Sequence, residues 1–491
     1  MLYQACEELT EAVIYFAVVF GPWAFGTTQS WSIWIMNAAG YLLGVLLGIK
    51  LFIRYFKRYA PPRWNSPTNR NPAILRALIC ALAGLSVILV VYCLIAAVNA
   101  RATFREETLS FDYHESVSWL PQSLDSIGTW NAFWMYLGIG CAFWGIWDWL
   151  GGKALGEQPG APSQPPASRK GAGLVPKRLA SLIWVLSISG MLLALEAIVQ
   201  RLTRSPRLLF LVQPRIHGPE GQFGPFAYRS NAAQYFNLLW PLCLAFWLKL
   251  RQNTSHKTRW NWLPLLAAAL LAACPIISTS RGGALVSAGM ICLLLISSSA
   301  SRFLPANPAR EPSALQAPAP ARLLLFALGA LGLGCGLGWE ALKPRMNQLA
   351  QALEGREEIY SAARPIARDY PIFGTGPGTF ETVSQLYPRP DVFWPAQLHD
   401  DWLETRITFG WIGSGLIVLA FLVILARWFM PGRICAGTEF MLPIWIGVAG
   451  CLIHARFDFP FQVHSVLFLF TVLCAILFSV ARKPQFTGIH A

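Results

Sequence analysis

Apolar residues fill long runs along the whole chain, and shorter polar segments separate these runs. A helix that crosses the hydrocarbon core of a bilayer needs about 20 mostly apolar residues. Each backbone polar group in hydrocarbon must be bonded within the chain, so the α-helix is the default spanning unit. The pattern therefore predicts an all-α polytopic membrane protein with about twelve transmembrane helices. They are expected near residues 10–26, 31–49, 74–98, 130–150, 179–200, 232–250, 260–279, 283–300, 323–339, 407–427, 438–456 and 461–480.

The composition agrees with this pattern. Hydrophobic residues make up 55% of the 491 residues and charged residues only 13%, which is too few to cover a soluble protein of this length. The short alternating segments of transmembrane barrels are absent from the sequence. Nearly all of the eleven cysteines fall in the predicted spans, and none lies in the polar loops at 99–129, 201–231 or 340–406. This placement argues against structural disulfides and metal sites.

Basic residues predict the orientation of the chain. They gather in the segments 50–73, 151–178 and 249–259, which the positive-inside rule places in the cytoplasm. An even number of spans then puts both termini there, and no cleavable signal peptide is expected, since residues 1–12 carry no Lys or Arg. The expected organisation is N-terminal helices at 1–150, a flexible Pro/Gly/Ser-rich linker at 151–178, a membrane domain at 179–480 that includes a large periplasmic loop at 340–406, and a cytoplasmic tail at 481–491.

The outer side of this topology carries more arginine than the rule predicts. It holds 16 of the 39 basic residues, and all of these except Lys343 are arginines. Arginine presents a planar, permanently charged fork that suits phosphate oxygens. The excess indicates an anionic ligand on the outer side. The alternative is that individual arginines pair with loop acids such as Glu106, Asp112 or Glu357, or with lipid headgroups.

Several short motifs follow one another in the second half of the chain. YRSN stands before the span at 232–250, and STSRGGALVS joins two spans at 278–287. The 340–406 loop then holds an R-x3-Y pair, the glycine-rich DYPIFGTGPGTF and LHDDWLETRITFGWIG. DFPFQ leads into the last span. Each fragment alone is a weak signal, whereas their order, spacing and membrane placement together are specific.

In these motifs the chain resembles the O-antigen ligase and Wzy-type polysaccharide polymerase superfamily, most strongly over 220–475. The resemblance implies a helical glycosyltransferase of the C type on the outer face of the bacterial inner membrane. Such enzymes transfer a glycan from a polyprenyl diphosphate carrier to an acceptor sugar with inversion, and they need no metal, cofactor or nucleic acid. The acceptor is lipid A–core in ligases and a growing lipid-linked polysaccharide in polymerases, and the motifs leave this choice open.

His399 is the expected general base, as its position in the motif implies and as the reference pKa of histidine near ~6.5 allows. Asp400 and Asp401 follow it directly, and one of these carboxylates is expected to orient the ring. The family often has Asn where Asp400 stands, and Thr408 replaces a common acid while Glu404 lies four residues earlier. These departures leave the partner of His399 open, and His217 and His454 are weaker candidates.

Arginines are the expected ligands of the leaving diphosphate. Arg281 is the first candidate and Arg229 the second, although Arg281 could instead reach a lipid phosphate. Arg356, Arg364 and Arg368 are one or two helical turns apart and would share a face, but Pro365 is expected to interrupt their helix. Nearby, Asn231 is expected to cap a helix, and Tyr360 could stack on a sugar or pack.

A transporter or flippase for lipid-linked glycans or other anions is the alternative of another class. Transporters place ionisable groups in the middle of their spans and often show two related halves. Here Glu196 is the plainest acid within a span, and the two halves show no convincing repeat.

Overall fold

The computed structural model describes residues 1–63, 72–154, 175–214, 218–252, 259–303, 320–387, 396–429, 434–436 and 438–482. Its α-helices are α1 (Leu2–Trp23), α2 (Ser30–Phe56), α3 (Pro72–Val98), α4 (Ser126–Leu150), α5 (Lys177–Leu202), α6 (Arg229–Gln252), α7 (Leu263–Ile277), α8 (Arg281–Phe303), α9 (Pro320–Asn347), α10 (Leu349–Asp369), α11 (Phe380–Val383), α12 (Asp401–Trp428), α13 (Thr438–His454) and α14 (His464–Ser479). Short 3-10 turns lie at Phe25–Thr27, Ser384–Leu386 and Pro460–Gln462. The strands are β1 (Ala102–Arg105), β2 (Ser110–Tyr113), β3 (Ile434–Ala436) and β4 (Val480–Arg482).

The protein is mostly helical, as the apolar pattern predicts, and each of the twelve expected spans overlaps one of these helices. Among the described residues, α2, α3, α5, α8, α9 and α12 are long and apolar enough to cross a membrane, while α7, α13 and α14 are apolar but shorter. The count of twelve crossings and the orientation stay predictions. So does the division into domains, because the centre of the expected linker and nearly all of the tail lie outside the described residues.

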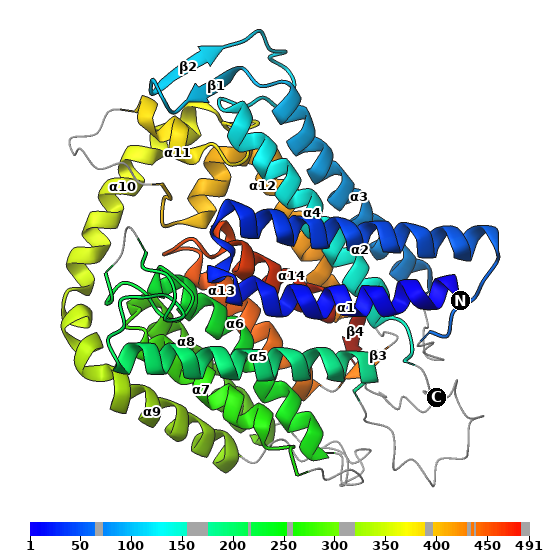
Figure 1. Ribbon diagram of the computed structural model, residues 1–491, viewed down its shortest axis with the longest axis vertical. Helices are drawn as coiled ribbons and strands as arrows, with labels where there is room; N and C mark the ends of the chain where they lie inside the picture. Colours follow the sequence, from blue (N-terminus) through cyan, green and yellow to red (C-terminus); the bar gives the residue numbers. More distant parts are fainter. Residues whose placement is uncertain are drawn as a thin grey trace.

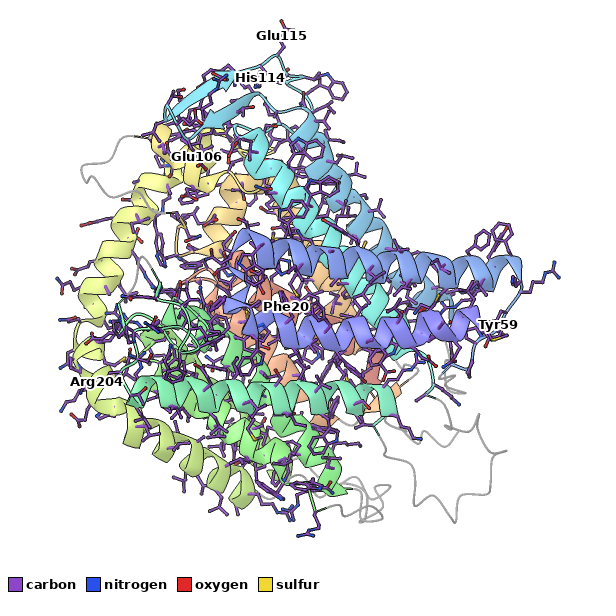
Figure 2. All side chains as sticks on the ribbon, viewed as in Figure 1. Phe20, Tyr59, Glu106, His114, Glu115 and Arg204 are labelled. Atoms are coloured by element: carbon purple, nitrogen blue, oxygen red, sulfur yellow. The ribbon has the colours of Figure 1, made fainter. Side chains whose placement is uncertain are left out.

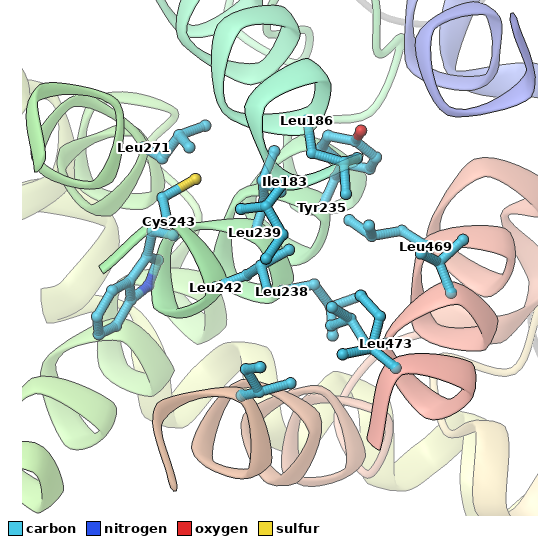
Figure 3. Close-up of a cluster of buried hydrophobic side chains, with 14 of the residues drawn as sticks. Ile183, Leu186, Tyr235, Leu238, Leu239, Leu242, Cys243, Leu271, Leu469 and Leu473 are labelled. Atoms are coloured by element: carbon cyan, nitrogen blue, oxygen red, sulfur yellow. The ribbon is translucent and has the colours of Figure 1, made fainter. Parts of the chain in front are cut away.

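The helices pack around one large hydrophobic core that draws on distant parts of the sequence. Figure 3 shows its centre, where Ile183 and Leu186 of α5 meet Leu239 of α6 and Leu469 of α14. All four side chains are buried. The N-terminal helices belong to the same core, since Ile14 and Leu43 are part of this cluster. Extensive packing of this kind fixes the positions of the helix ends. The charged side chains of the candidate site lie at or near these ends.

The two ends of the bundle are distinct. In Figure 2, Arg204, just beyond α5, and Tyr59, just beyond α2, lie at opposite ends. The first of these, called the His399 end below, holds the end of α5 and the starts of α6, α8 and α12. Helix α10 runs along this side of the molecule and joins α9 to the segment that carries α11 (Figure 1). The expected 340–406 loop is therefore partly helical.

Helix α10 corrects one prediction. It continues from Leu349 to Asp369 with Pro365 inside it, although a break was expected at this proline. Proline removes the hydrogen bond to the carbonyl four residues earlier, which belongs to Ser361. Both Ser361 and Pro365 are exposed, so water can satisfy that carbonyl.

The glycine-rich segment 374–378 is a turn that packs between α4 and α12. Gly374 and Gly410 both have positive φ angles, and a Cβ on Gly374 would lie 2.5 Å from the Gly410 backbone nitrogen. The backbone of Thr375 donates to the carbonyl of Ile407 at 2.9 Å. On the other side, Thr129 donates to the carbonyl of Pro377 at 2.9 Å. The turn thus ties the start of α12, and the histidine before it, to the N-terminal helices.

Candidate functional site

His399 lies immediately before α12, in a backbone conformation that non-glycine residues seldom adopt, with φ at +61°. The hydroxyl of Tyr360, from α10, donates a hydrogen bond to the His399 carbonyl oxygen at 2.7 Å. The guanidinium of Arg456 lies over the Tyr360 ring, 5.5 Å from its centroid. Tyr360 therefore packs and holds the backbone that carries the histidine. Its side chain is buried, which does not suit stacking on a sugar.

The partner of the His399 ring is Asp458, in the segment between α13 and α14. The Nδ1 atom of His399 lies 3.1 Å from Oδ1 of Asp458. Burial alone would raise the pKa of this carboxyl, but the hydrogen bond from His399 and nearby positive charge, including that of Arg356, outweigh burial and lower the pKa. Asp458 is thus a carboxylate that accepts the Nδ1 proton. Nε2 of His399 then keeps its lone pair, and the side chain is 28% exposed, so this nitrogen can act as a base.

The carboxylates of Asp400 and Asp401, which were expected to orient the ring, bind other groups. Asp400 caps α12 by accepting from the Leu403 backbone at 3.2 Å, and Arg456 donates to it at 2.6 Å. Burial raises the pKa of Asp400, against these two contacts. Asp401 accepts from the Phe461 backbone at 2.8 Å. The first backbone N–H groups of α12 have no acceptor within the helix, and the Asp400 carboxylate accepts a hydrogen bond from one of them.

Aromatic side chains enclose the histidine. The rings of Tyr228 and Phe459 are stacked, with centroids 5.5 Å apart. His399 meets Phe459 edge-on at 4.9 Å and Tyr228 at 6.1 Å. Burial raises the pKa of Tyr228 to about 12, so its hydroxyl stays protonated. Tyr228 also interacts electrostatically with Asp458, Arg356 and Arg229, which connects the histidine with two of the arginines.

Arg281 and Arg229 both come to the His399 end, as expected. Arg281 is the first residue of α8, and its Nη1 donates to the carbonyls of Gln348 at 3.1 Å and Arg345 at 3.3 Å. Arg229 is the first residue of α6, and its Nη1 donates to the carbonyl of Glu220 at 2.6 Å. Both guanidinium groups are held by uncharged acceptors.

The three arginines of α10 separate. Arg356 donates to the carbonyl of Phe457, and its Nη2 lies 3.9 Å from Asp458, so it belongs to the site. Arg364 pairs with Glu357 on the exposed face of the helix, which is the alternative that the sequence left open. Arg368 is also exposed. Only Arg356 contacts the carboxylate that binds the histidine.

Asn231 does not act as the expected cap. Helix α6 begins at Arg229, two residues earlier, and the buried Oδ1 of Asn231 has no hydrogen-bond partner in the described part of the chain. The histidines considered as weaker candidates differ in their surroundings. His454 is buried beside Gly282, and His217 lies outside the described residues.

Four residues of the site were not singled out by the motifs for these roles: Asp458, Tyr228, Arg345 and Arg201. DFPFQ drew attention to the segment of Asp458, but nothing in the sequence pairs it with a histidine 59 residues away. Arg345, near the end of α9, supplies a carbonyl to Arg281. Arg201, near the end of α5, donates to the carbonyls of Gln222 and Ser278. Arg201, Arg229, Arg281 and Arg345 are called the arginine group below.

Chemically, the site offers one histidine base, one carboxylate that orients it and a set of fixed positive charges. Among the described residues, no three His, Cys, Asp or Glu side chains come together in a way that would hold a metal ion.

Comparison with known proteins agrees with the motifs. Residues 266–418 match the family model described as O-Antigen ligase. This range contains SRGG, the Arg356–Tyr360 pair, the glycine-rich turn and His399, whereas YRSN and DFPFQ lie outside it. No curated protein and no solved structure gives a significant match to the chain. The resemblance inferred from the motifs is confirmed over this segment, which is similar to the O-antigen ligase family.

Proposed function

We propose that the protein is an inverting membrane glycosyltransferase that moves a glycan from a polyprenyl diphosphate to an acceptor sugar. The observation that carries this proposal is the proximity of the His399–Asp458 pair to arginines that form no ion pair with a carboxylate among the described residues. A base suits the acceptor hydroxyl, and fixed cations suit the diphosphate that departs. The family match supports the same reaction class.

In the proposed reaction, the acceptor oxygen attacks the anomeric carbon of the donor from the face opposite the diphosphate. His399 Nε2 takes the hydroxyl proton as the new glycosidic bond forms. The bond between the anomeric carbon and the diphosphate oxygen breaks, and polyprenyl diphosphate leaves with the bonding electron pair. Asp458 stabilises the imidazolium that results. Arg281 and Arg229 stabilise the charge that develops on the diphosphate, with Arg356 near the base.

The membrane position follows from the same chemistry. The polyprenyl tail would stay in the bilayer while its diphosphate reaches the helix ends at the His399 end. The topology expected from the basic residues places this end on the periplasmic face of the bacterial inner membrane, with both termini in the cytoplasm.

A transfer experiment tests the proposal and separates ligase from polymerase. Purified protein is mixed with a polyprenyl-diphosphate oligosaccharide, with and without a lipid A–core acceptor, and the products are resolved by mass. Longer glycans on the polyprenyl carrier would identify a polymerase, and transfer only to the core would identify a ligase. No transfer with either acceptor would contradict the proposal. Movement of the intact lipid-linked glycan across vesicles would then favour a flippase.

A further inference from the structure

The arginine group contains two pairs, and a backbone carbonyl links each of them in a different way. Arg201 and Arg229 both donate from Nη1 to the carbonyl of Glu220, at 3.4 Å and 2.6 Å. Arg281 donates to the carbonyl of Arg345 at 3.3 Å. The first pair also reaches the turn before α8, because Arg201 donates to the Ser278 carbonyl and Arg229 to the Thr279 hydroxyl. The two pairs are therefore neighbours around the start of one helix.

None of the four arginines forms an ion pair with a carboxylate among the residues that the structure describes. Backbone carbonyls fix the planes of the guanidinium groups but do not neutralise their charge. Arg345 is the strongest like-charge neighbour of both Arg229 and Arg281. Glu220 contributes one negative charge near Arg201 and Arg345. The net positive charge that remains on the four arginines, held partly out of water, is stabilised when an anion with more than one charge enters.

Unused donors point to the same conclusion. The Nε atoms of Arg201 and Arg345 are buried and have no hydrogen-bond partner within the described ranges. A buried donor without a partner costs about 1–3 kcal/mol, so native structures seldom leave one empty. Each pair thus contains one arginine with an unused donor, and these two arginines are the ones that the motifs did not mark.

We infer that the arginine group is a two-phosphate site, in which the Arg201–Arg229 pair binds one phosphate of a prenyl diphosphate and the Arg281–Arg345 pair binds the other. This inference rests on the proposed function, because it takes the lipid carrier of that reaction as the ligand. It adds Arg201 and Arg345 to the binding residues. It also makes the second phosphate, rather than the prenyl chain, the source of selectivity against lipid monophosphates.

Binding of farnesyl diphosphate and farnesyl monophosphate to the purified full-length protein tests the inference without any glycan. Wild-type protein should bind the diphosphate at least roughly tenfold more tightly, as expected for a second set of charge-assisted hydrogen bonds. Arg201→Gln and Arg345→Gln should each lose most of this preference by weakening diphosphate binding. Arg207→Gln and Lys343→Gln remove one exposed positive charge nearby on the same segments and should bind both ligands like the wild type.

Equal affinity of the wild-type protein for the two ligands would overturn the inference, and this measurement needs no variant. Wild-type behaviour of the Arg201 and Arg345 variants would also overturn it, as would an equal loss of both ligands. Melting temperatures of the ligand-free proteins identify variants that fold poorly. In their place, Arg201→Lys and Arg345→Lys are measured, because lysine keeps the positive charge but lacks the planar guanidinium fork.

The inference and the proposed function can fail separately. Selective diphosphate binding without any glycan transfer would leave the two-phosphate site standing and refute the glycosyltransferase. Glycan transfer that does not depend on Arg201 or Arg345 would do the reverse.

Discussion

Two groups of basic side chains lie near opposite ends of α5, and they are partnered differently. Arg178 and Arg201 are 23 residues apart on this helix, or about 35 Å at 1.5 Å per residue. At the Arg178 end, basic residues surround two buried carboxylates, Glu7 and Asp148. Lys50 is fully buried and lies 3.3 Å from Glu7 and 3.1 Å from Asp148. Its companions are Arg54, Arg63 and Arg178, each paired with one of these acids. These six residues are called the ion-pair network below.

At the His399 end, the arginine group has backbone carbonyls in place of carboxylates. Removing a charge from water is costly unless an opposite charge compensates it. The ion-pair network contains its own compensation and joins α1, α2, α4 and α5, which is what a structural role requires. The arginine group has one nearby carboxylate, that of Glu220, and forms no ion pair among the described residues, which suits a site for an anionic ligand. Substitutions at the two ends should therefore have opposite effects on stability and activity.

The largest expected effect on stability comes from the ion-pair network. Asp148→Asn leaves Lys50, Arg54 and Arg63 without their shared carboxylate, and the free energy of unfolding should fall by about 3–5 kcal/mol. Thermal unfolding in detergent measures this loss. Asp112→Asn is the matched control, because Asp112 pairs with Arg105 in an exposed hairpin, where an ion pair contributes about 0–1 kcal/mol. Equal melting temperatures for the two variants would contradict the structural role of the network.

The arginine group should show the opposite behaviour. Arg281→Ala should lower glycan transfer roughly 100-fold or more, since it removes a cation from the leaving group. Its melting temperature should stay the same or rise, because repulsion from Arg345 is relieved. Arg54→Ala should lower the melting temperature and keep the transfer activity of the protein that remains folded. If Arg281→Ala destabilised the protein as much as Arg54→Ala does, the distinction between the two ends would fail.

A conservative change at the same position separates charge from geometry. Arg281→Lys keeps the positive charge but loses the planar fork, so transfer should fall by roughly tenfold. The rate at saturating donor and the donor concentration for half-maximal rate are measured with the same variant. Wild-type rates would argue against bidentate binding of a phosphate.

The smallest effect concerns pH and the Asp458–His399 contact. The pKa of Asp458 lies below its usual value of 3.8 in the folded protein, so its stabilising contribution is present above that pH and is lost as the pH falls through the lower folded value. Asp458→Asn should therefore lower the melting temperature at about pH 5, by the equivalent of roughly 1–3 kcal/mol. The difference from wild type should shrink below about pH 4. A difference that grows in acid would mean that the carboxyl is protonated in the native state.

The sequence predicted the helices well because their signal is local. Runs of apolar residues locate them, and the motifs place His399, Arg229 and Arg281 at helix starts, where the structure also has them. The partner of the histidine could not be predicted in the same way. Asp400 is adjacent in sequence but caps α12, while Asp458 reaches the ring only after α12 and α13 have packed.

The grouping of the arginines could not be predicted from the local sequence either. Arg356 and Arg364 are two turns apart on one helix and would be expected to act together, yet only the first faces the site. Arg345 and Arg201 join Arg281 and Arg229 because four helix ends meet there, and that meeting depends on the packing of the whole bundle. Local patterns therefore indicated a class of site and some candidate residues, whereas long-range packing decides which side chains lie together.

The most direct test of the account compares binding and transfer in one variant, His399→Ala. Farnesyl diphosphate affinity and glycan transfer from a polyprenyl-diphosphate oligosaccharide are measured on the same preparation, with wild type and Arg281→Ala beside it. The account predicts that His399→Ala binds the diphosphate like the wild type and transfers no glycan, whereas Arg281→Ala loses both. Full transfer by His399→Ala would contradict the assignment of the base and with it the proposed mechanism.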